Sequence, residues 1–150
     1  ALVVREQVLA AQFVAAQVLQ RAAVTGDGWL TYFYRPESFA KSWEKIRRFA
    51  VEGGKDPDTL LNASQLPIRV GPSRAAVEAG MMDWLGKEWD YASWSDSTKD
   101  SAILGNVDEC VAQLKEHLAV GVQKIIFVPY KYEMEQIEII AKEIIPRLRT

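Results

Sequence analysis

The sequence predicts an α/β fold built on a parallel sheet, and three observations support this. Short strand-like segments alternate with segments whose apolar residues recur at helical spacing. Residues 124–130, Lys-Ile-Ile-Phe-Val-Pro-Tyr, are a nearly continuous apolar run, which is typical of a parallel strand buried on both faces. Helices separate the three predicted strands, as right-handed crossovers between parallel strands require. The 150 residues are 49% hydrophobic and 25% charged, which suits one domain with a real core.

The amino-terminal part of the chain predicts a helix, a tight turn and a strand. Residues 1–20 have apolar side chains at loosely helical spacing and are interpreted as an amphipathic helical segment of uncertain origin. We set it apart from the α/β unit expected over residues 21–150. Gly26, Asp27 and Gly28 predict a helix end and a turn. Residues 29–34, Trp-Leu-Thr-Tyr-Phe-Tyr, predict a short aromatic strand.

A second helix is predicted to begin near Pro36 and to end at Gly53-Gly54. Proline suits the first turn of a helix, because the N–H that it lacks has no partner there, and glycine commonly ends one. The apolar face of this helix is formed by Phe39, Trp43, Ile46 and Ala50. Residues 59–70 then predict an extended segment, in which Pro67 indicates a bulge or an irregular entry.

Three further helices and one further strand are predicted in the rest of the chain. A helix is expected over residues 73–89, and residues 90–105 are polar enough to predict a long loop. Asn106 and Glu109 have the spacing of a capping box, so a helix is expected to begin there. The strand over 124–130 follows it. The last helix, residues 133–145, is expected to turn inward the side chains of Met134, Ile137, Ala141, Ile144 and Leu148.

Composition excludes several classes of function. A net charge of −2 gives no reason to expect nucleic acid or an anionic membrane as a partner. No apolar run reaches the roughly 20 residues that span a bilayer. With one cysteine the chain can form no internal disulfide, which fits a cytoplasmic protein. The sequence has no phosphate-binding glycine loop, no Cys/His cluster for a metal and no credible Ser–His–Asp set, so we assign no catalytic residue and no metal ligand.

The reactive side chains and the tryptophans have structural interpretations. His117 has no evident orienting partner and is interpreted as a surface or boundary residue of its helix. Cys110, on the apolar stripe of the same helix, is interpreted as a small buried hydrophobe. An aromatic-rich stretch predicts a loop pinned to the core, or a subunit interface, in preference to a substrate pocket; it contains Trp84, Trp89, Tyr91 and Trp94.

Candidate ligand-binding residues lie where predicted strands end. Ligands of parallel α/β proteins bind at the carboxyl ends of strands, where Tyr32, Tyr34, Arg35 and Tyr130 are expected. Aromatic rings there can flank a flat ring system, and the arginine can pair with a phosphate or carboxylate. Packing at a strand end, with a surface arginine, is the alternative. The Gly26-Asp27-Gly28 turn can either approach a cofactor or simply join a helix to a strand.

Four groups of motifs together resemble luciferase-like, flavin-dependent monooxygenases and oxidoreductases, over roughly residues 21–149. The first is residues 21–29, Arg-Ala-Ala-Val-Thr-Gly-Asp-Gly-Trp. The second is residues 36–46 followed by Gly-Lys-Asp-Pro at 54–57, where Lys55 stands in place of the usual arginine. The third, residues 105–114, is similar to a helix start of that family. The fourth pairs residues 121–129 with residues 140–148, similar to its last strand and last helix.

The resemblance implies the carboxyl-terminal portion of a TIM barrel, with about three parallel strands and flanking helices. Alone, such a chain would be an incomplete barrel whose sheet edge is covered by a second copy, by the missing barrel half or by the amino-terminal helix. Members of the family use FMN or a deazaflavin coenzyme on small organic substrates, and many are dimers. By the same resemblance, the cofactor-binding residues would be Gly26, Asp27, Gly28, Trp29, Tyr34 and Arg35.

Two hypotheses about function follow. The first is part of a flavin- or deazaflavin-dependent oxidoreductase or monooxygenase, in which the chain alone is not competent. The second is a non-catalytic α/β fragment or shortened relative that serves as an interaction or dimerisation module. The place of the family's glycine-rich phosphate loop is here held by residues 1–20, which contain no glycine, and this favours the second hypothesis.

Overall fold

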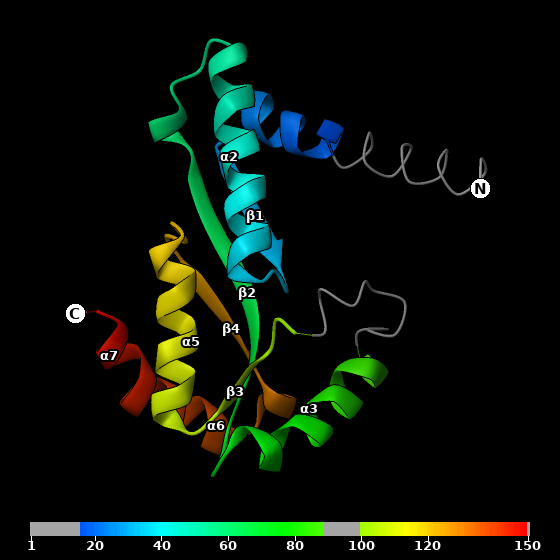
Figure 1. The fold of residues 1–150 in the computed structure, drawn as a ribbon, viewed down its shortest axis with the longest axis vertical. Helices are drawn as coiled ribbons and strands as arrows, with labels where there is room; N and C mark the ends of the chain where they lie inside the picture. The colour runs from blue at the N-terminus through cyan, green and yellow to red at the C-terminus, as the bar shows by residue number, and fades with distance from the viewer. Residues whose placement is uncertain (1–15, 89–99, 150) are drawn as a thin grey trace. The chain divides into compact units, whose positions relative to one another are not determined.

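The computed structural model describes residues 16–88 and 100–149, which belong to two compact units (Figure 1). The first unit comprises the described residues up to Trp29, together with Ala40–Asn62. The second comprises Leu30–Phe39 and the described residues from Ala63 onward. Within these described ranges, no helix is long and apolar enough to cross a membrane.

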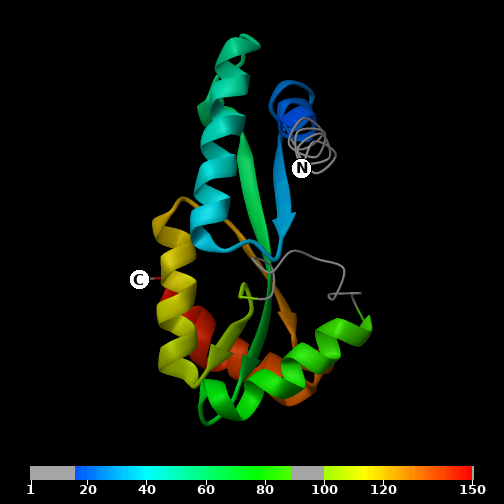
Figure 2. The ribbon, with the colours of Figure 1, turned by 45° about the vertical axis from the view of Figure 1, so that its right-hand side comes forward.

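A parallel sheet of four strands organises the chain. The strands are β1 (Gly28–Tyr32), β2 (Leu61–Val70), β3 (Ile103–Gly105) and β4 (Ile125–Pro129), with β2 at the centre (Figures 1 and 2). The pairing of β2 with β4 runs from Ser64 opposite Ile125 to Ile68 opposite Pro129. The pairing of β2 with β3 is shorter and sets Ile68, Arg69 and Val70 opposite Ile103, Leu104 and Gly105. The α/β class with a parallel sheet is therefore confirmed.

The backbone hydrogen bonds show which strands share an edge of β2. The N–H of Phe33 donates to the carbonyl of Gln65, and the N–H of Gly71 donates to the carbonyl of Gly105. The N–H of Ser64 donates instead to the carbonyl of Lys124, just before β4. Backbone groups of successive strand residues point to opposite edges. Thus β1 and β3 lie in turn along one edge of β2, and β4 lies along the other.

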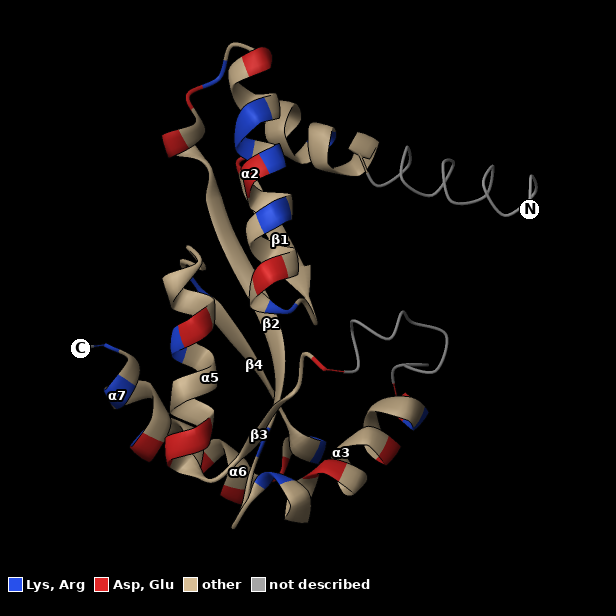
Figure 3. Ribbon diagram, viewed as in Figure 1, with Lys and Arg blue, Asp and Glu red and all other residues tan. Residues whose placement is uncertain are grey.

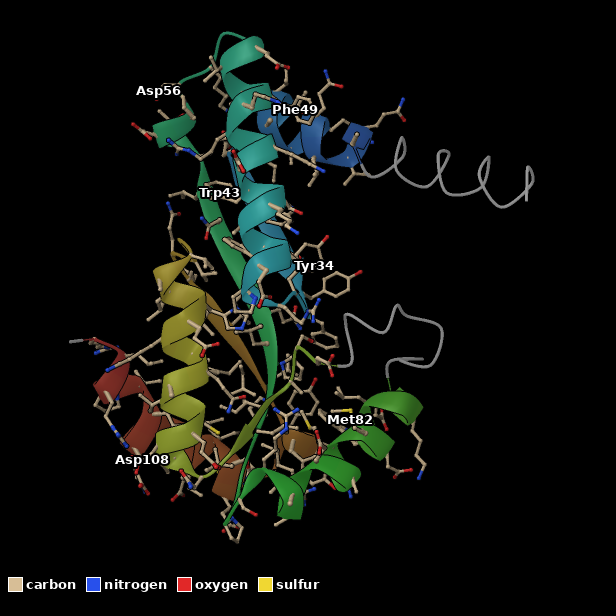
Figure 4. The ribbon with its side chains drawn as sticks, in the orientation of Figure 1. Tyr34, Trp43, Phe49, Asp56, Met82 and Asp108 are labelled. Atoms are coloured by element: carbon tan, nitrogen blue, oxygen red, sulfur yellow. The ribbon has the colours of Figure 1, made fainter. Side chains whose placement is uncertain are left out.

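The first unit contains helical residues 16–25, most of helix α2 (Pro36–Glu52) and the short 3-10 helix η1 (Pro57–Thr59). The predicted apolar face of α2 is confirmed, because all four of its side chains are buried. Figure 4 labels one of them, Trp43. The helix gives way at Gly53-Gly54, where Gly54 has a φ of 76° that an L side chain would strain to adopt.

The second unit packs helices on both faces of the sheet. Helix α3 (Arg74–Glu88) contributes to one buried cluster, and helix α5 (Val107–Ala119) contributes to the other. The capping box at the start of α5 is confirmed: the N–H of Glu109 donates to Asn106, and the N–H of Asn106 donates to the Glu109 carboxylate. The first cluster also takes in Phe33, Leu104, Val128 and Tyr130, and the second takes in Leu66, Ile68, Val70 and Ile103.

Two predictions about the strands were wrong. The loop expected over residues 90–105 contains β3 at its end, where Ala102, Ile103 and Leu104 are buried; residues 89–99 lie outside the described residues. The strand β4 is not buried on both faces, because Ile126 is 39% exposed. Among the described residues β4 pairs on one side only, with β2, so its apolar composition is not matched by burial.

The inward face of the last helix also differs from prediction. The helix consists of α6 (Met134–Ile139), a π-helical segment (Ile140–Ile144) and α7 (Ile145–Leu148). Met134 and Ile137 are 67% and 40% exposed and Ala141 is exposed too, whereas Gln136 and Ile140 are buried. Ile144 is buried as predicted, and Leu148 is partly buried. The Gln136 amide accepts a hydrogen bond from the N–H of Val70 and donates one to its carbonyl. These two bonds turn the Gln136 side of α6 toward β2. The π-helical segment that follows changes which residues of the helix face the core.

Candidate functional site at the carboxyl ends of the strands

The Gly26-Asp27-Gly28 turn before β1 is tightly packed within the first unit. A Cβ on Gly28 would lie 2.4 Å from the carbonyl oxygen of Leu61, and one on Gly26 would lie 2.8 Å from that of Ala22. The Lys55 ammonium donates a hydrogen bond to the carbonyl of Gly26, and the N–H of Leu61 donates to that of Asp27. Both glycines are therefore needed for backbone approach inside the protein.

Trp29, at the start of β1, has a packing partner of its own. Its ring stacks on that of Trp43, with 6.5 Å between the ring centroids and 6° between the planes. The structure thus places the first four predicted cofactor-binding residues at the amino end of β1, in a packed joint. The other two, Tyr34 and Arg35, follow its carboxyl end, in the second unit. The cofactor role of all six stays a prediction.

The segment after β1 combines strain with an unsatisfied donor. Phe33 is fully buried although its φ is 61°, a left-handed value that is uncommon for a bulky side chain. Its ring meets that of Tyr32 edge-on, and Tyr34 lies half-buried in the connection to α2, where Figure 4 labels it. The Nε of Arg35 is buried without a hydrogen-bond partner among the described residues. Such strain is tolerated where the surroundings fix it, and it clusters at functional sites.

The segment after β4 shows the same kind of strain. Lys131 and Tyr132 have φ values of 48° and 53°, and no other described residue except glycines and Phe33 has a positive φ. The Trp84 ring meets the rings of Tyr130 and Tyr132 edge-on, with centroids 5.6 and 5.7 Å away. Tyr130 and Trp84 are buried in the same cluster as Phe33. The strand ends of β1 and β4 therefore both contribute to one aromatic cluster.

Arg69 is the only charged residue in the four strands, and Figure 3 shows the charges gathered on the helices and connections instead. Its guanidinium carbon lies 3.8 Å from the centroid of the Tyr130 ring, within cation–π range. One of its N–H groups donates to the carbonyl of Val77 at 3.0 Å. Sequence reasoning missed Arg69; the signal available was a single charge within an otherwise uncharged strand.

The two reactive side chains lie on the other face of the sheet, on α5. His117 is 2% exposed, so the prediction of a surface or boundary residue was wrong. Its Nδ1 has no partner among the described residues, and burial lowers its pKa to about 4 although Glu37 acts in the opposite direction. Cys110 is buried as predicted, and burial raises the pKa of its thiol to about 12, which disfavours the nucleophilic thiolate.

The described residues offer no ligand set for a metal ion. The described part of the chain contains no group of three or more His, Cys, Asp or Glu side chains placed to hold an ion. Of the predicted strand-end residues, Tyr130 joins the aromatic cluster, Tyr32 is 53% exposed and contacts Phe33, and Tyr34 and Arg35 follow directly. Of the tryptophan-rich stretch, Trp84 is buried in that cluster, and the other three residues lie outside the described residues.

Comparison with known proteins identifies the fold. No protein-family model and no curated protein sequence matches the chain. Among solved structures, an F420-dependent secondary alcohol dehydrogenase in complex with an F420–acetone adduct matches with a TM-score of 0.73 and 17% identity, over 90% of this chain and 47% of its own. The coenzyme F420-dependent tetrahydromethanopterin reductase from Methanopyrus kandleri matches with a TM-score of 0.67 and 16% identity, over 89% and 48%.

A third solved structure extends the likeness to an enzyme that binds FMN. The oxygenating constituent of 3,6-diketocamphane monooxygenase from Pseudomonas putida, in complex with FMN, matches with a TM-score of 0.57 and 15% identity, over 87% of this chain and 45% of its own. The chain thus spans about half the length of the structures that it matches. Its fold is that of part of these F420-dependent and FMN-bound enzymes, which agrees with the partial α/β barrel predicted from the sequence.

Proposed function

We propose that this chain is part of a flavin- or deazaflavin-dependent oxidoreductase that acts on a small organic substrate. The observation that carries the proposal is the shared fold: three structures that match the chain over about nine-tenths of its length are F420-dependent or hold FMN. Fold alone does not fix function, so the site has to be compatible with such a cofactor.

The second unit offers groups that fit one. The Arg35 Nε is a buried donor without an acceptor among residues 16–88 and 100–149, and an anionic oxygen of a cofactor would satisfy it. Tyr34 precedes it and is half-buried, so its ring can line one side of a flat ring system. A bound flavin or deazaflavin would supply hydride transfer or oxygen activation. The chain's own residues would bind and orient it and exclude water.

The edge of β4 that is unpaired among the described residues suggests a partner for this chain. Within the described residues, β4 is paired along one edge only, and unpaired strand edges in native proteins are usually covered. We propose that a second copy or another barrel half covers this edge. Either FMN or a deazaflavin suits the groups described, because both carry a flat ring system and anionic oxygens.

The proposal is tested by titrating the full-length gene product with FMN and, separately, with F420. Equilibrium dialysis shows binding, and mixing the reduced cofactor with oxygen or a carbonyl substrate shows turnover. We expect saturable binding of one of the two cofactors at one site. If neither cofactor binds the full-length product, the oxidoreductase proposal fails and the non-catalytic module, favoured by the glycine-free residues 1–20, takes its place.

A further inference from the structure

We propose that Arg69, Tyr130 and Lys131 form an anion-binding site, which takes a phosphate or carboxylate group at the carboxyl ends of β2 and β4. The three residues belong to the second unit. The inference does not depend on the proposed oxidoreductase function, because it is drawn from the contacts of these residues alone.

The guanidinium of Arg69 is held in a fixed position. The hydrogen bond to Val77 and the face of Tyr130 hold its guanidinium from two directions. Gly80 of α3 leaves room for it, since a Cβ on Gly80 would lie only 2.2 Å from Nη1. An arginine held in this way loses little conformational freedom when a ligand binds, which favours affinity.

Arg69 has N–H groups that no other described residue uses as donors. No ion pair among the described residues includes Arg69, and one of its N–H groups is used, by Val77. The side chain is only partly buried, and none of its nitrogens is among the buried atoms without a partner. Its Nε and Nη2 are therefore exposed to solvent. A planar fork of unused donors is the arrangement that binds phosphate and carboxylate in a bidentate manner.

Two positively charged side chains, Arg69 and Lys131, lie close to the Tyr130 ring. The Lys131 ammonium lies 5.1 Å from the centroid of the same ring over which Arg69 is stacked. On α3, the Lys87 ammonium donates a hydrogen bond to the Asp83 carboxylate at 2.7 Å, so that carboxylate already has a partner. Two cationic side chains held against one ring raise the positive potential around it, which favours the binding of an anion.

Arg69 and Lys131 both lie at the carboxyl ends of strands. Arg69 is the penultimate residue of β2, and Lys131 follows β4 by two residues. Ligands of parallel α/β proteins bind at this end of the strands, often through a phosphate group. The left-handed backbone of Lys131 is the kind of local strain found at ligand-binding segments.

The test uses the full-length gene product and inorganic phosphate, titrated at constant ionic strength against chloride and followed by NMR chemical shifts. Arg69→Gln and Lys131→Gln are compared with Arg48→Gln. Arg48 is the matched control, since its guanidinium also lies over an aromatic ring, that of Phe49, but pairs with Glu52. Lys131 is exposed, so its variant is expected to fold even if the Arg69 variant does not.

We expect Arg69→Gln to weaken phosphate binding about tenfold and Lys131→Gln to weaken it about threefold, with no change for Arg48→Gln. Absence of phosphate binding to the wild type, or equal binding by Lys131→Gln and Arg48→Gln, overturns the proposal. Comparing FMN with riboflavin identifies the source of the anion. If Arg69→Gln weakens the binding of FMN but not that of riboflavin, the site binds the cofactor phosphate. If Arg69→Gln weakens the binding of inorganic phosphate but leaves the binding of both flavins unchanged, the site binds an anionic group of the substrate.

The same experiment separates this proposal from the proposed function. Phosphate binding that depends on Arg69, in a protein that binds neither FMN nor F420, supports the anion site and removes the oxidoreductase. If the protein binds FMN or F420 but shows no specific phosphate binding, the oxidoreductase proposal is supported and the anion-binding site is overturned.

Discussion

The turn before β1 and the segments after β1 and β4 differ in how fully their backbone and polar groups are satisfied. The turn uses glycines at close backbone approaches, and internal donors occupy the carbonyls of Gly26 and Asp27. The segments after the strands contain every positive φ that is not at a glycine in the described residues, together with the unpartnered Nε of Arg35. The turn has the properties of a structural joint, and the later segments have those of a place where a ligand is expected.

This difference explains why a motif can mark a family without forming its site. The Gly26-Asp27-Gly28 turn helped to indicate the family because backbone packing needs those glycines. Internal hydrogen bonds already use the backbone carbonyls of Gly26 and Asp27, so these two groups have little to offer a ligand. Unsatisfied donors cost folding free energy, so their presence in the second unit needs another explanation, and ligand binding supplies one.

The largest expected effect is at the joint. Gly28→Ala forces a Cβ to within 2.4 Å of a backbone carbonyl, and we expect it to lower the free energy of unfolding by about 3 kcal/mol or more. Urea denaturation measures this. Gly86→Ala on α3 is the control, because nothing lies within 4 Å of the added Cβ; it should gain about 1 kcal/mol from better helix propensity. Equal, small effects at both positions would contradict the packed joint.

The second effect tests the cost of an unsatisfied group in the second unit. The unfolded chain protonates His117 near its ordinary pKa of about 6.5, but burial lowers its pKa in the folded state to about 4. Between these values the unfolded state holds more protons, so the free energy of unfolding falls as the pH falls. We expect about 2–3 kcal/mol of pH-dependent loss, which His117→Gln should remove from the urea denaturation series. An unchanged pH slope in the variant would show that His117 is not the titrating group.

The third effect compares Arg35, which has a buried nitrogen without a hydrogen-bond partner among the described residues, with Arg47, which has two partners. Arg35→Met removes a buried donor that has no partner and should raise the free energy of unfolding of the ligand-free protein by up to about 1 kcal/mol. Arg47→Met should instead lower it by about 1 kcal/mol, because Arg47 bonds both Asp58 and the carbonyl of Pro57. Chemical denaturation of both variants gives the comparison. A loss at Arg35 as large as that at Arg47 would mean that Arg35 is satisfied after all.

The smallest effect concerns backbone strain. Lys131→Gly relieves a left-handed conformation at a non-glycine residue, and we expect a gain of about 0.5 kcal/mol in the ligand-free protein. Lys115→Gly, at an exposed position within α5, should lose about 1 kcal/mol from lower helix propensity. Thermal unfolding measures both. If Lys131→Gly lowers the free energy of unfolding as much as Lys115→Gly does, the backbone after β4 is not strained.

Local signals predicted much of the fold. The capping box at Asn106, the apolar face of α2 and its end at Gly53-Gly54 each depend on residues a few positions apart, so the sequence reveals them. The strand β3 is too short to show a period. The face of the last helix is set by the bond between Gln136 and Val70, far away in the sequence, which no local pattern contains.

The candidate site was predicted only where position along a strand was enough. Tyr34 and Arg35 were predicted because ligands bind where parallel strands end, and their role in binding stays a prediction. Arg69 was missed because its importance comes from Val77, Tyr130 and Gly80, which meet it only in the folded protein. The burial of His117 was missed for a similar reason: the stripe on α5 predicts which side chains are near the sheet but not how deeply each is covered.

The most direct test of this account compares cofactor binding by variants at the two ends of β1. Dissociation constants of FMN and F420 for the full-length gene product are measured by fluorescence for the wild type, Arg35→Met and Asp27→Asn. The account predicts that the wild type binds one cofactor, that Arg35→Met weakens binding about tenfold, and that Asp27→Asn leaves it within about twofold. Greater loss in Asp27→Asn than in Arg35→Met, or no binding by the wild type, would contradict it.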